Sequence, residues 1–258
     1  MSTPSNEFAD NLFDQVLSIW VNPEIERRKQ AGLIGDKFVL WAAQVIMDPS
    51  GPEQVRLNDE AQGIFKLQNL PDDSTVSPAT FHNITGDIKE FTLAKDDCPN
   101  AGHITLIRHM KGFFIAFDFL YNAAVIADHV RTAQEFLDEA KAALSSKRIK
   151  AFVANLHVAT ELTAKSLLLR HPDKNLMTSK KHSYVLSKYN EYSKQGNTEQ
   201  RFAQLLNNLA NLRNAARYPN NSFSVTQEQA EQMLEVAEEM FAVLMKSIPK
   251  RAQARLAE

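Results

Sequence analysis

The sequence predicts an α+β fold, in which a mixed N-terminal part, residues 1–121, is followed by a helical bundle, residues 122–258. Before residue 122 the apolar residues mostly recur at every second position, as in strands, whereas after it they recur about every 3.6 positions, as in amphipathic helices. A chain of 258 residues is long enough for two domains that each bury a core. We therefore expect one domain with an antiparallel sheet and one domain of packed helices.

The N-terminal part is expected to begin with a helix and to continue with strands. Apolar residues at helical spacing predict a short helix over residues 7–20. The run 38–47 and the run 54–67 flank the turn-forming residues 48–52, an arrangement that predicts a β-hairpin. Residues 71–78 are polar and rich in turn formers, which predicts an exposed loop.

Further strands are predicted over residues 84–93 and 102–121. In the second range, an alternating segment, the turn Lys111-Gly112 and a second alternating segment predict another hairpin. Its return strand carries five apolar residues on one face, for which we expect a place in the core: Phe113, Ile115, Phe117, Phe119 and Tyr121.

A bundle of four or five helices is predicted after residue 122. Apolar residues follow helical spacing in the ranges 125–144, 149–167, 182–192, 198–218 and 227–248. Pro219 is expected to end the fourth helix, because proline cannot donate a backbone hydrogen bond, and Thr226 is a candidate N-cap of the fifth.

Composition argues against several classes of protein. Cys98 is the single cysteine, which excludes an internal disulfide and a cysteine-based metal cluster and suits a reducing compartment. No apolar run approaches the roughly 20 residues of a membrane helix, and the first residues lack a signal-peptide pattern. We therefore expect a cytoplasmic protein with no membrane anchor.

Metal and cofactor sites are not predicted. His103 and His109 share one face of a predicted strand, but no third ligand of suitable spacing accompanies them. The chain has only 8 glycines and contains no glycine-rich phosphate loop, zinc signature or nucleophile elbow. We therefore expect neither a metal nor a cofactor.

Charge is distributed unevenly along the chain. Residues 1–121 carry 10 Lys and Arg against 17 Asp and Glu, a net charge of −7, and residues 122–258 carry 19 against 14, a net charge of +5. Residues 147–217 carry 13 basic against 4 acidic residues, a net charge of +9. A polyanion is expected to meet the second half first, although these lysines could equally serve only to solvate helix faces.

Three segments of the C-terminal half follow one another in an order and at a spacing that can be compared with known families. A helix containing Glu135-Phe136-Leu137-Asp138-Glu139-Ala140 leads into Ala151-Phe152-Val153-Ala154-Asn155-Leu156-His157. Lys180-Lys181-His182-Ser183-Tyr184-Val185-Leu186 follows, and Leu212-Arg213-Asn214 closes the fourth helix. In order and spacing this half, about residues 122–248, resembles the higher eukaryote and prokaryote nucleotide-binding (HEPN) family.

The resemblance implies a site at the end of the fourth helix. Ribonuclease-active HEPN proteins carry an Arg, usually followed by a polar residue, and a His five positions after the Arg, at a dimer interface. Arg213 and Asn214 match the first part of this motif, but Tyr218 stands where the His is expected. Tyrosine has a reference pKa near 10, which makes it a poor base at neutral pH.

Arg213 remains suited to hold a phosphate through two parallel hydrogen bonds. A purely structural role is the alternative, in which Arg213 caps carbonyl groups at its helix end and Tyr218 packs under the fifth helix. His182 is the histidine that could replace the missing one as acid or base, if it approaches Arg213; otherwise it caps or packs its helix. His157, among apolar neighbours, is expected to be a core or interface histidine.

The sequence thus predicts an RNA- or nucleotide-directed, HEPN-like protein. The first hypothesis is a metal-independent ribonuclease of a bacterial defence or toxin–antitoxin system. Its catalytic residues would be Arg213, Asn214, Tyr218 and His182. Its partners would be RNA or a nucleotide, a second copy bound through the helical bundle, and in some settings another protein.

Two alternatives of other classes stay open. In one, the bundle is a catalytically inactive HEPN module that binds a nucleotide or a partner protein. In the other, the helices only mediate oligomerisation and ligand specificity lies in the N-terminal domain.

Overall fold

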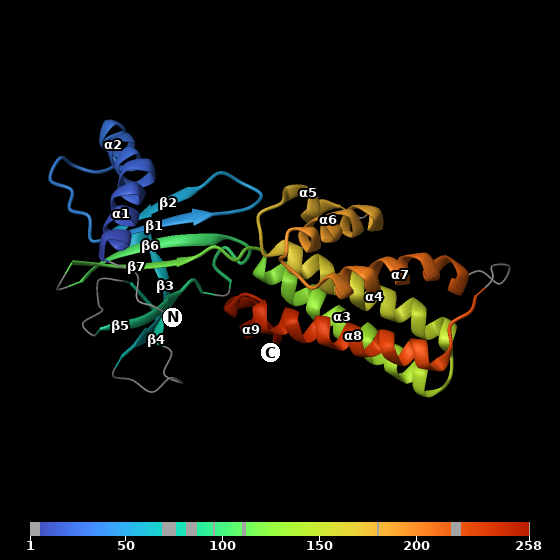
Figure 1. Cartoon of the computed structure of the whole chain (residues 1–258). Helices are drawn as coiled ribbons and strands as arrows, with labels where there is room; N and C mark the ends of the chain where they lie inside the picture. Colours follow the sequence, from blue (N-terminus) through green and yellow to red (C-terminus); the bar gives the residue numbers. More distant parts are fainter. Residues whose placement is uncertain are drawn as a thin grey trace. The chain divides into compact units, whose positions relative to one another are not determined.

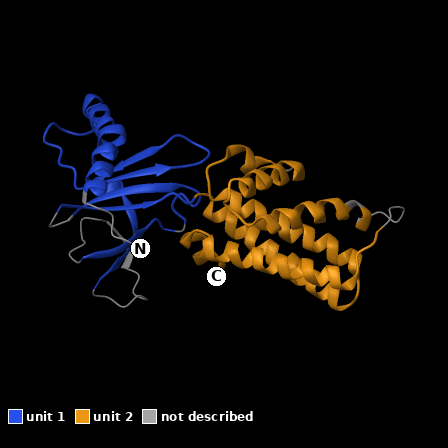
Figure 2. Cartoon of the chain, in the orientation of Figure 1, with its two compact units in different colours: residues 1–120 blue, residues 121–258 orange. Residues whose placement is uncertain are grey.

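The computed structural model describes residues 6–68, 76–80, 87–94, 96–109, 112–179, 181–217 and 223–257. The chain divides into two compact units, Met1–Leu120 and Tyr121–Glu258 (Figure 2). The first unit combines helices with antiparallel sheets, and the second is helical (Figure 1). The predicted α+β fold is therefore confirmed.

A continuous helical segment opens the first unit. It consists of α1 (Asn6–Val16), the π-helical turn η1 (Leu17–Val21) and α2 (Asn22–Gln30). The helix predicted over residues 7–20 is present but extends further. Pro23 lies in the first turn of α2 and has no N–H to donate, which accounts for the wide turn just before it.

Two antiparallel sheets follow in the described part of the first unit, with strand orders β2-β1-β6-β7 and β4-β3-β5. The strands are β1 (Ala42–Met47), β2 (Gln54–Leu57), β3 (Gln62–Leu67), β4 (Val76–Thr80), β5 (Ile88–Thr92), β6 (Gly102–His109) and β7 (Gly112–Asp118). β1 pairs with β2, and β6 pairs with β7, so both predicted hairpins are confirmed.

Two strand predictions need correction. The predicted strand range 54–67 is broken by the short 3-10 helix η2 (Asn58–Glu60), so its two parts join different sheets. The loop predicted over residues 71–78 is wrong at its end, because Val76 begins β4, which pairs with β3. Residues 71–75 and 84–86 lie outside the described residues.

The two faces of β1 enter two different cores. Ala42 and Ile46 pack with Phe65 of β3 and Phe91 of β5, which joins the two sheets. Ala43 and Val45, on the opposite face, form a cluster with residues of the helical segment such as Val16 and Val21. The alternation of side chains along a strand therefore lets β1 contribute to both layers.

The face of β7 that the sequence placed in the core is only partly buried: Ile115 packs against the cluster of the helical segment, and the Phe113 ring contacts the Phe13 ring with centroids 4.9 Å apart. Phe113, Phe117 and Phe119 are 36%, 49% and 45% exposed. The other face of β7, with Phe114 and Ala116, packs against the cluster between the sheets. β7 is an edge strand of its sheet in the described part of the chain, and alternation reveals which residues share a face but not which face is covered.

The second unit is a helical bundle. Its helices are α3 (Ala123–Ser145), α4 (Ile149–Leu169), α5 (Lys174–Thr178), α6 (His182–Lys194), α7 (Gln200–Arg217), α8 (Gln227–Ser247) and α9 (Lys250–Leu256). The five predicted helices are confirmed, and α5 and α9 are additional. Thr226 is the predicted N-cap of α8, because its hydroxyl accepts from the Gln229 amide and the Gln229 side chain accepts from the Thr226 amide.

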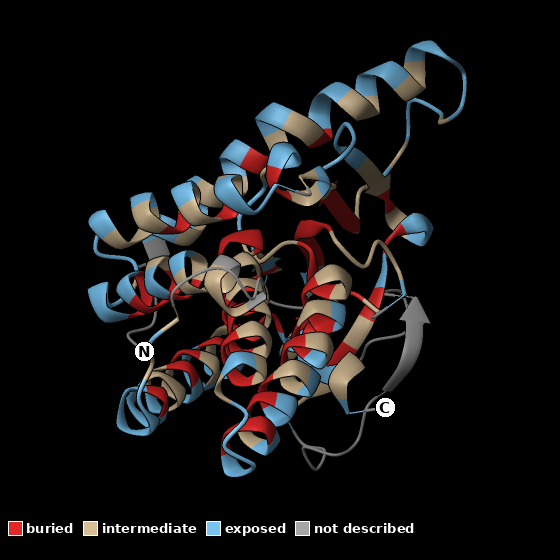
Figure 3. Cartoon of the chain, turned by 90° about the vertical axis from the view of Figure 1, so that its right-hand side faces the viewer, coloured by how far each residue is buried: buried red, intermediate tan, exposed pale blue. Residues whose placement is uncertain are grey.

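α4 packs against α3, α5, α6, α7 and α8. Figure 3 shows that the buried residues of the helices gather on the sides turned toward neighbouring helices. None of the helices in the described part of the chain combines the length and the apolar character that a membrane crossing requires. Because α4 is surrounded by other helices, its polar side chains lie between neighbouring helices, and two of them, His157 and Glu161, line a pocket.

Candidate functional site

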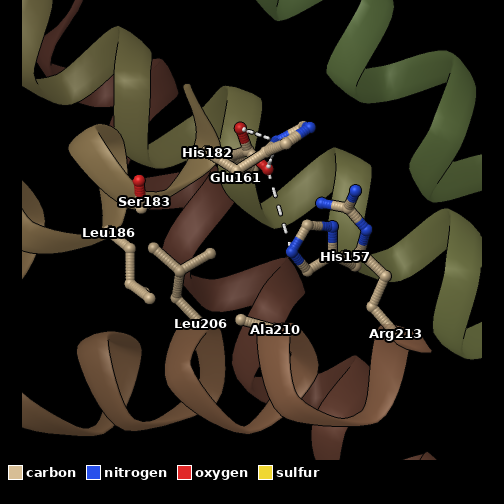
Figure 4. A pocket seen from close by; sticks show the side chains of 8 residues that line it. All are labelled: His157, Glu161, His182, Ser183, Leu186, Leu206, Ala210 and Arg213. Carbon is tan, nitrogen blue, oxygen red and sulfur yellow. Dashed lines mark hydrogen bonds and ion pairs between the residues drawn. The ribbon is translucent and has the colours of Figure 1, made fainter. Parts of the chain in front are cut away.

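A pocket of about 270 Å³ in the second unit brings four ionisable side chains together (Figure 4). His157 and Glu161 come from α4, His182 comes from α6 and Arg213 comes from α7. The rest of the lining consists of Ser183, Leu186, Leu206 and Ala210. His182 and Arg213, two of the residues of the predicted site, thus line one pocket.

A pair of asparagines fixes the helices that form this pocket. The Asn190 amide donates to Asn207 Oδ1 at 3.1 Å, and the Asn207 amide donates to Asn190 Oδ1 at 2.8 Å. Each amide also donates to a backbone carbonyl of its own helix. Because the two side chains satisfy each other, they tie α6 to α7 beside the pocket without leaving a polar group unpaired.

Glu161 holds the His182 ring. His182 Nδ1 lies 2.6 Å from both carboxylate oxygens of Glu161. An ionised carboxylate only accepts hydrogen bonds, so Nδ1 carries the proton and donates a hydrogen bond to Glu161, which leaves Nε2 for another partner. The ring is 58% exposed, whereas the Glu161 side chain is 17% exposed. His182 thus contacts a carboxylate from another helix rather than capping its own.

His157 stands on the other side of the same carboxylate. Its Nε2 lies 3.7 Å from Glu161 Oε2, and its ring meets the His182 ring edge-on with centroids 6.1 Å apart. The residue is 3% exposed, as expected for a core histidine. Its polar edge nevertheless reaches the pocket, so Glu161 lies between two imidazoles (Figure 4).

Arg213 lines the pocket without a partner among the residues that the structure describes. Its Nε is shielded from solvent and makes no hydrogen bond, and its guanidinium forms no ion pair with any residue that the structure describes. The capping of helix carbonyls that we considered as an alternative is therefore not seen within the described part of the chain. A shielded N–H without an acceptor is unfavourable, and an anion in the pocket would satisfy it.

A comparison with known protein families identifies part of the second unit. Residues 126–248 match the model of the HEPN domain. The second unit contains a HEPN domain. HEPN domains are known for ribonuclease and nucleotide-related roles, and they often bind nucleotides or dimerise. None of the curated proteins matches the chain.

Of the four predicted site residues in the HEPN domain, two lie at the pocket and two fall outside what the structure describes. Arg213 and His182 line the pocket. Asn214 follows Arg213 on α7, but its side chain lies outside the described atoms, and Tyr218 lies outside the described residues. The sequence interpretation missed Glu161, although its position four residues after His157 places both on one face of α4.

Polar groups continue along α4 beyond the pocket. Burial lowers the pKa of Lys165, one turn after Glu161, although the Glu161 carboxylate opposes this effect. Burial, together with the positive charge of Lys165, lowers the pKa of His129 on α3 to about 4. His129 is therefore neutral at pH 7.

Nowhere in the described part of the chain do three His, Cys, Asp or Glu side chains gather in a way that could hold a metal ion.

Proposed function

We propose that the HEPN domain acts on RNA as a metal-independent ribonuclease, in which Arg213 binds the scissile phosphate and His182 transfers a proton. The observation that carries the proposal is the shared pocket, where an arginine without a partner among the described residues stands near a histidine held by a carboxylate. The net charge of +9 over residues 147–217 supports a polyanionic substrate.

The chemistry follows from the two side chains. In RNA cleavage by the RNA's own 2′-hydroxyl, the 2′-oxygen bonds to the neighbouring phosphorus while the bond from phosphorus to the 5′-oxygen breaks. One proton leaves the 2′-hydroxyl and one reaches the leaving 5′-oxygen, and a histidine suits either transfer near neutral pH, with water serving for the other. Glu161 fixes the ring with Nε2 free, in the way that a carboxylate orients a catalytic imidazole. The Arg213 guanidinium would stabilise negative charge on the phosphate during the reaction. His182 would thereby supply what Tyr218 cannot at neutral pH.

The experiment is cleavage of total RNA and tRNA by the purified protein, with and without added Mg²⁺. Arg213→Ala and His182→Ala should each reduce the cleavage rate by about 100-fold or more, because each removes a group that acts on the reacting phosphodiester. Arg201→Ala and His171→Ala are matched controls, since these residues lie outside the pocket. Equal cleavage by wild type and both pocket variants would contradict the proposal.

Tyr218 at the motif position favours a second candidate, a catalytically inactive HEPN module that binds a nucleotide or a partner protein. It predicts RNA binding without cleavage. Contacts to several phosphates would make that binding weaken steeply with salt, whereas binding to an apolar partner would respond little.

The proposal includes a homodimer formed through the helical bundle, because HEPN domains often dimerise. It also includes a cytoplasmic role in bacterial defence or in a toxin–antitoxin pair. Expression of the active protein in growing bacteria should then arrest growth, and the His182→Ala variant should not. Sedimentation of the purified chain tests the dimer independently of activity.

A further inference from the structure

The pocket has two chemically different halves. His157, Glu161, His182 and Arg213 form the polar half. Leu186 from α6 and Leu206 and Ala210 from α7 form the apolar half, and Figure 4 shows them together on the side away from His182 and Glu161. A phosphate against Arg213 gains nothing from three aliphatic side chains, so a ligand that fits the whole pocket carries an anion and an apolar group.

We propose that this apolar half receives the base of one unpaired nucleotide whose phosphate lies against Arg213. The inference rests on the proposed RNA-directed function and names the form of RNA that the site accepts. A nucleobase has two apolar faces and is joined to a phosphate through a short sugar, so it places both groups within one pocket. The basic charge of residues 147–217 favours this occupant over an apolar side chain of a protein partner.

The size of the pocket limits the occupant to one nucleotide. Its volume of about 270 Å³ is close to the lower end, roughly 300 Å³, of small-molecule sites. A base within a duplex is paired and stacked, and it enters such a pocket only after it leaves the stack. The site therefore takes a base from a single strand, a loop or a bulge and excludes intact duplex RNA.

The apolar half of the pocket, formed by Leu186, Leu206 and Ala210, is the base slot, and its walls are fixed before a ligand arrives. Leu206 is 2% exposed and belongs to the core cluster of the bundle. The Asn190–Asn207 pair joins α6 to α7 within one turn of Leu186 and Ala210. Because these amides use their hydrogen bonds on each other, they are not free to read the edge of a base.

Ser183 adds a polar group to the slot. Its side chain is exposed, and its hydroxyl has no hydrogen bond to any residue that the structure describes. A hydroxyl both donates and accepts, so it can meet the edge of any base or a ribose hydroxyl. The slot should therefore distinguish unpaired from paired nucleotides more strongly than one base from another.

The test compares two probes, adenosine 3′-monophosphate and inorganic phosphate, by calorimetry on the full chain. The wild type should bind the nucleotide at least about tenfold more tightly than phosphate, because only the nucleotide buries apolar surface in the slot. Ala210→Leu fills the slot and should remove this difference while phosphate binding persists. Arg213→Ala should weaken the binding of both probes.

Asn211→Leu is the matched control, because it adds the same side chain to an exposed position of α7 outside the pocket. A measurement without a variant accompanies it: the methyl NMR signals of Leu186 and Leu206 should shift with the nucleotide and stay in place with phosphate. Nucleotide binding by Ala210→Leu at the wild-type affinity, or no methyl shifts, would overturn the base slot.

The failure of this inference can be distinguished from failure of the proposed function. Cleavage of an RNA hairpin in its loop but not in its stem supports the slot, and equal cleavage of loop and stem overturns it while the ribonuclease stands. Tight nucleotide binding that Ala210→Leu abolishes, without any RNA cleavage, supports the slot while the ribonuclease proposal fails.

Discussion

Glu161 is the residue that orients the histidine side chains of the pocket. Its carboxylate accepts a hydrogen bond from His182 Nδ1, with the nitrogen and oxygen 2.6 Å apart, and also faces His157. We expect Glu161→Gln to lower kcat for RNA cleavage by roughly 10- to 100-fold, because an amide orients the ring less firmly than a carboxylate does. KM should change little, since Arg213 is untouched. Steady-state kinetics on a short single-stranded RNA measures both quantities.

Two further variants separate positioning from general damage. Glu161→Asp keeps the carboxylate and should recover part of the lost kcat. Glu191→Gln is the matched control, because Glu191 forms an exposed ion pair with Lys188 outside this pocket. A Glu161→Gln protein that cleaves at the wild-type rate would show that Glu161 has no role in orienting His182.

At the scale of single residues, the sequence predicted part of the candidate site. Arg213 could be found because it stands in a short motif at the end of a helix, and His182 because it lies in another of the segments that carry the family resemblance. Their presence in one pocket depends on how α6 packs against α7, which local spacing does not encode. Glu161 was missed because a single acidic residue on a helix has no distinctive pattern before its neighbours are known.

At the scale of elements, the half-buried His129 of α3 feels the charge of Lys165 on α4, and we expect it to give the bundle a pH dependence. The pKa of His129 is lowered to about 4 in the folded protein. Between that value and the usual value near 6.5, the unfolded chain binds a proton that the folded chain does not, so stability rises with pH across this window. Acidification should therefore remove no more than about 3 kcal/mol through His129.

Urea unfolding of the wild type and of His129→Gln at pH 7 and near pH 4.5 measures this effect. The glutamine variant has no group that titrates there and should lose less stability on acidification than the wild type. Other groups titrate equally in both proteins and cancel in the comparison. Equal losses in the two proteins would show that His129 is not the source of the pH dependence.

Element prediction succeeded where one period persists over several turns. α3, α4 and α8 carry long apolar stripes, and their cores lie where the stripes indicate. α5 and α9 have 5 and 7 residues, too few turns for a period to stand out. For β7 the period was right, but the predicted core face is only partly buried, because the layers that cover its two faces come from distant strands and helices and not from the strand itself.

At the scale of the whole molecule, the chain joins an acidic unit to a basic one. The net charge of residues 122–258 is +5, and residues 1–121 bring the total to −2. The hydrophobic clusters of the second unit consist entirely of its own residues, so we expect the fragment 121–258 to fold alone. Circular dichroism of this fragment should show a helical protein with a cooperative thermal transition.

The fragment 121–258 should bind a short single-stranded RNA more tightly than the full chain at low salt. The reason is long-range charge: the acidic unit repels the same phosphates that the basic unit attracts. Screening shortens the range of this repulsion to about 10 Å at 0.1 M salt, so the difference in affinity should shrink as salt is raised. Fluorescence anisotropy over a salt series measures both affinities. Equal affinities of the fragment and the full chain at every salt concentration would mean that the acidic unit does not limit access of RNA. A difference in affinity that persists at high salt would mean that the acidic unit acts by a direct contact and not by charge repulsion.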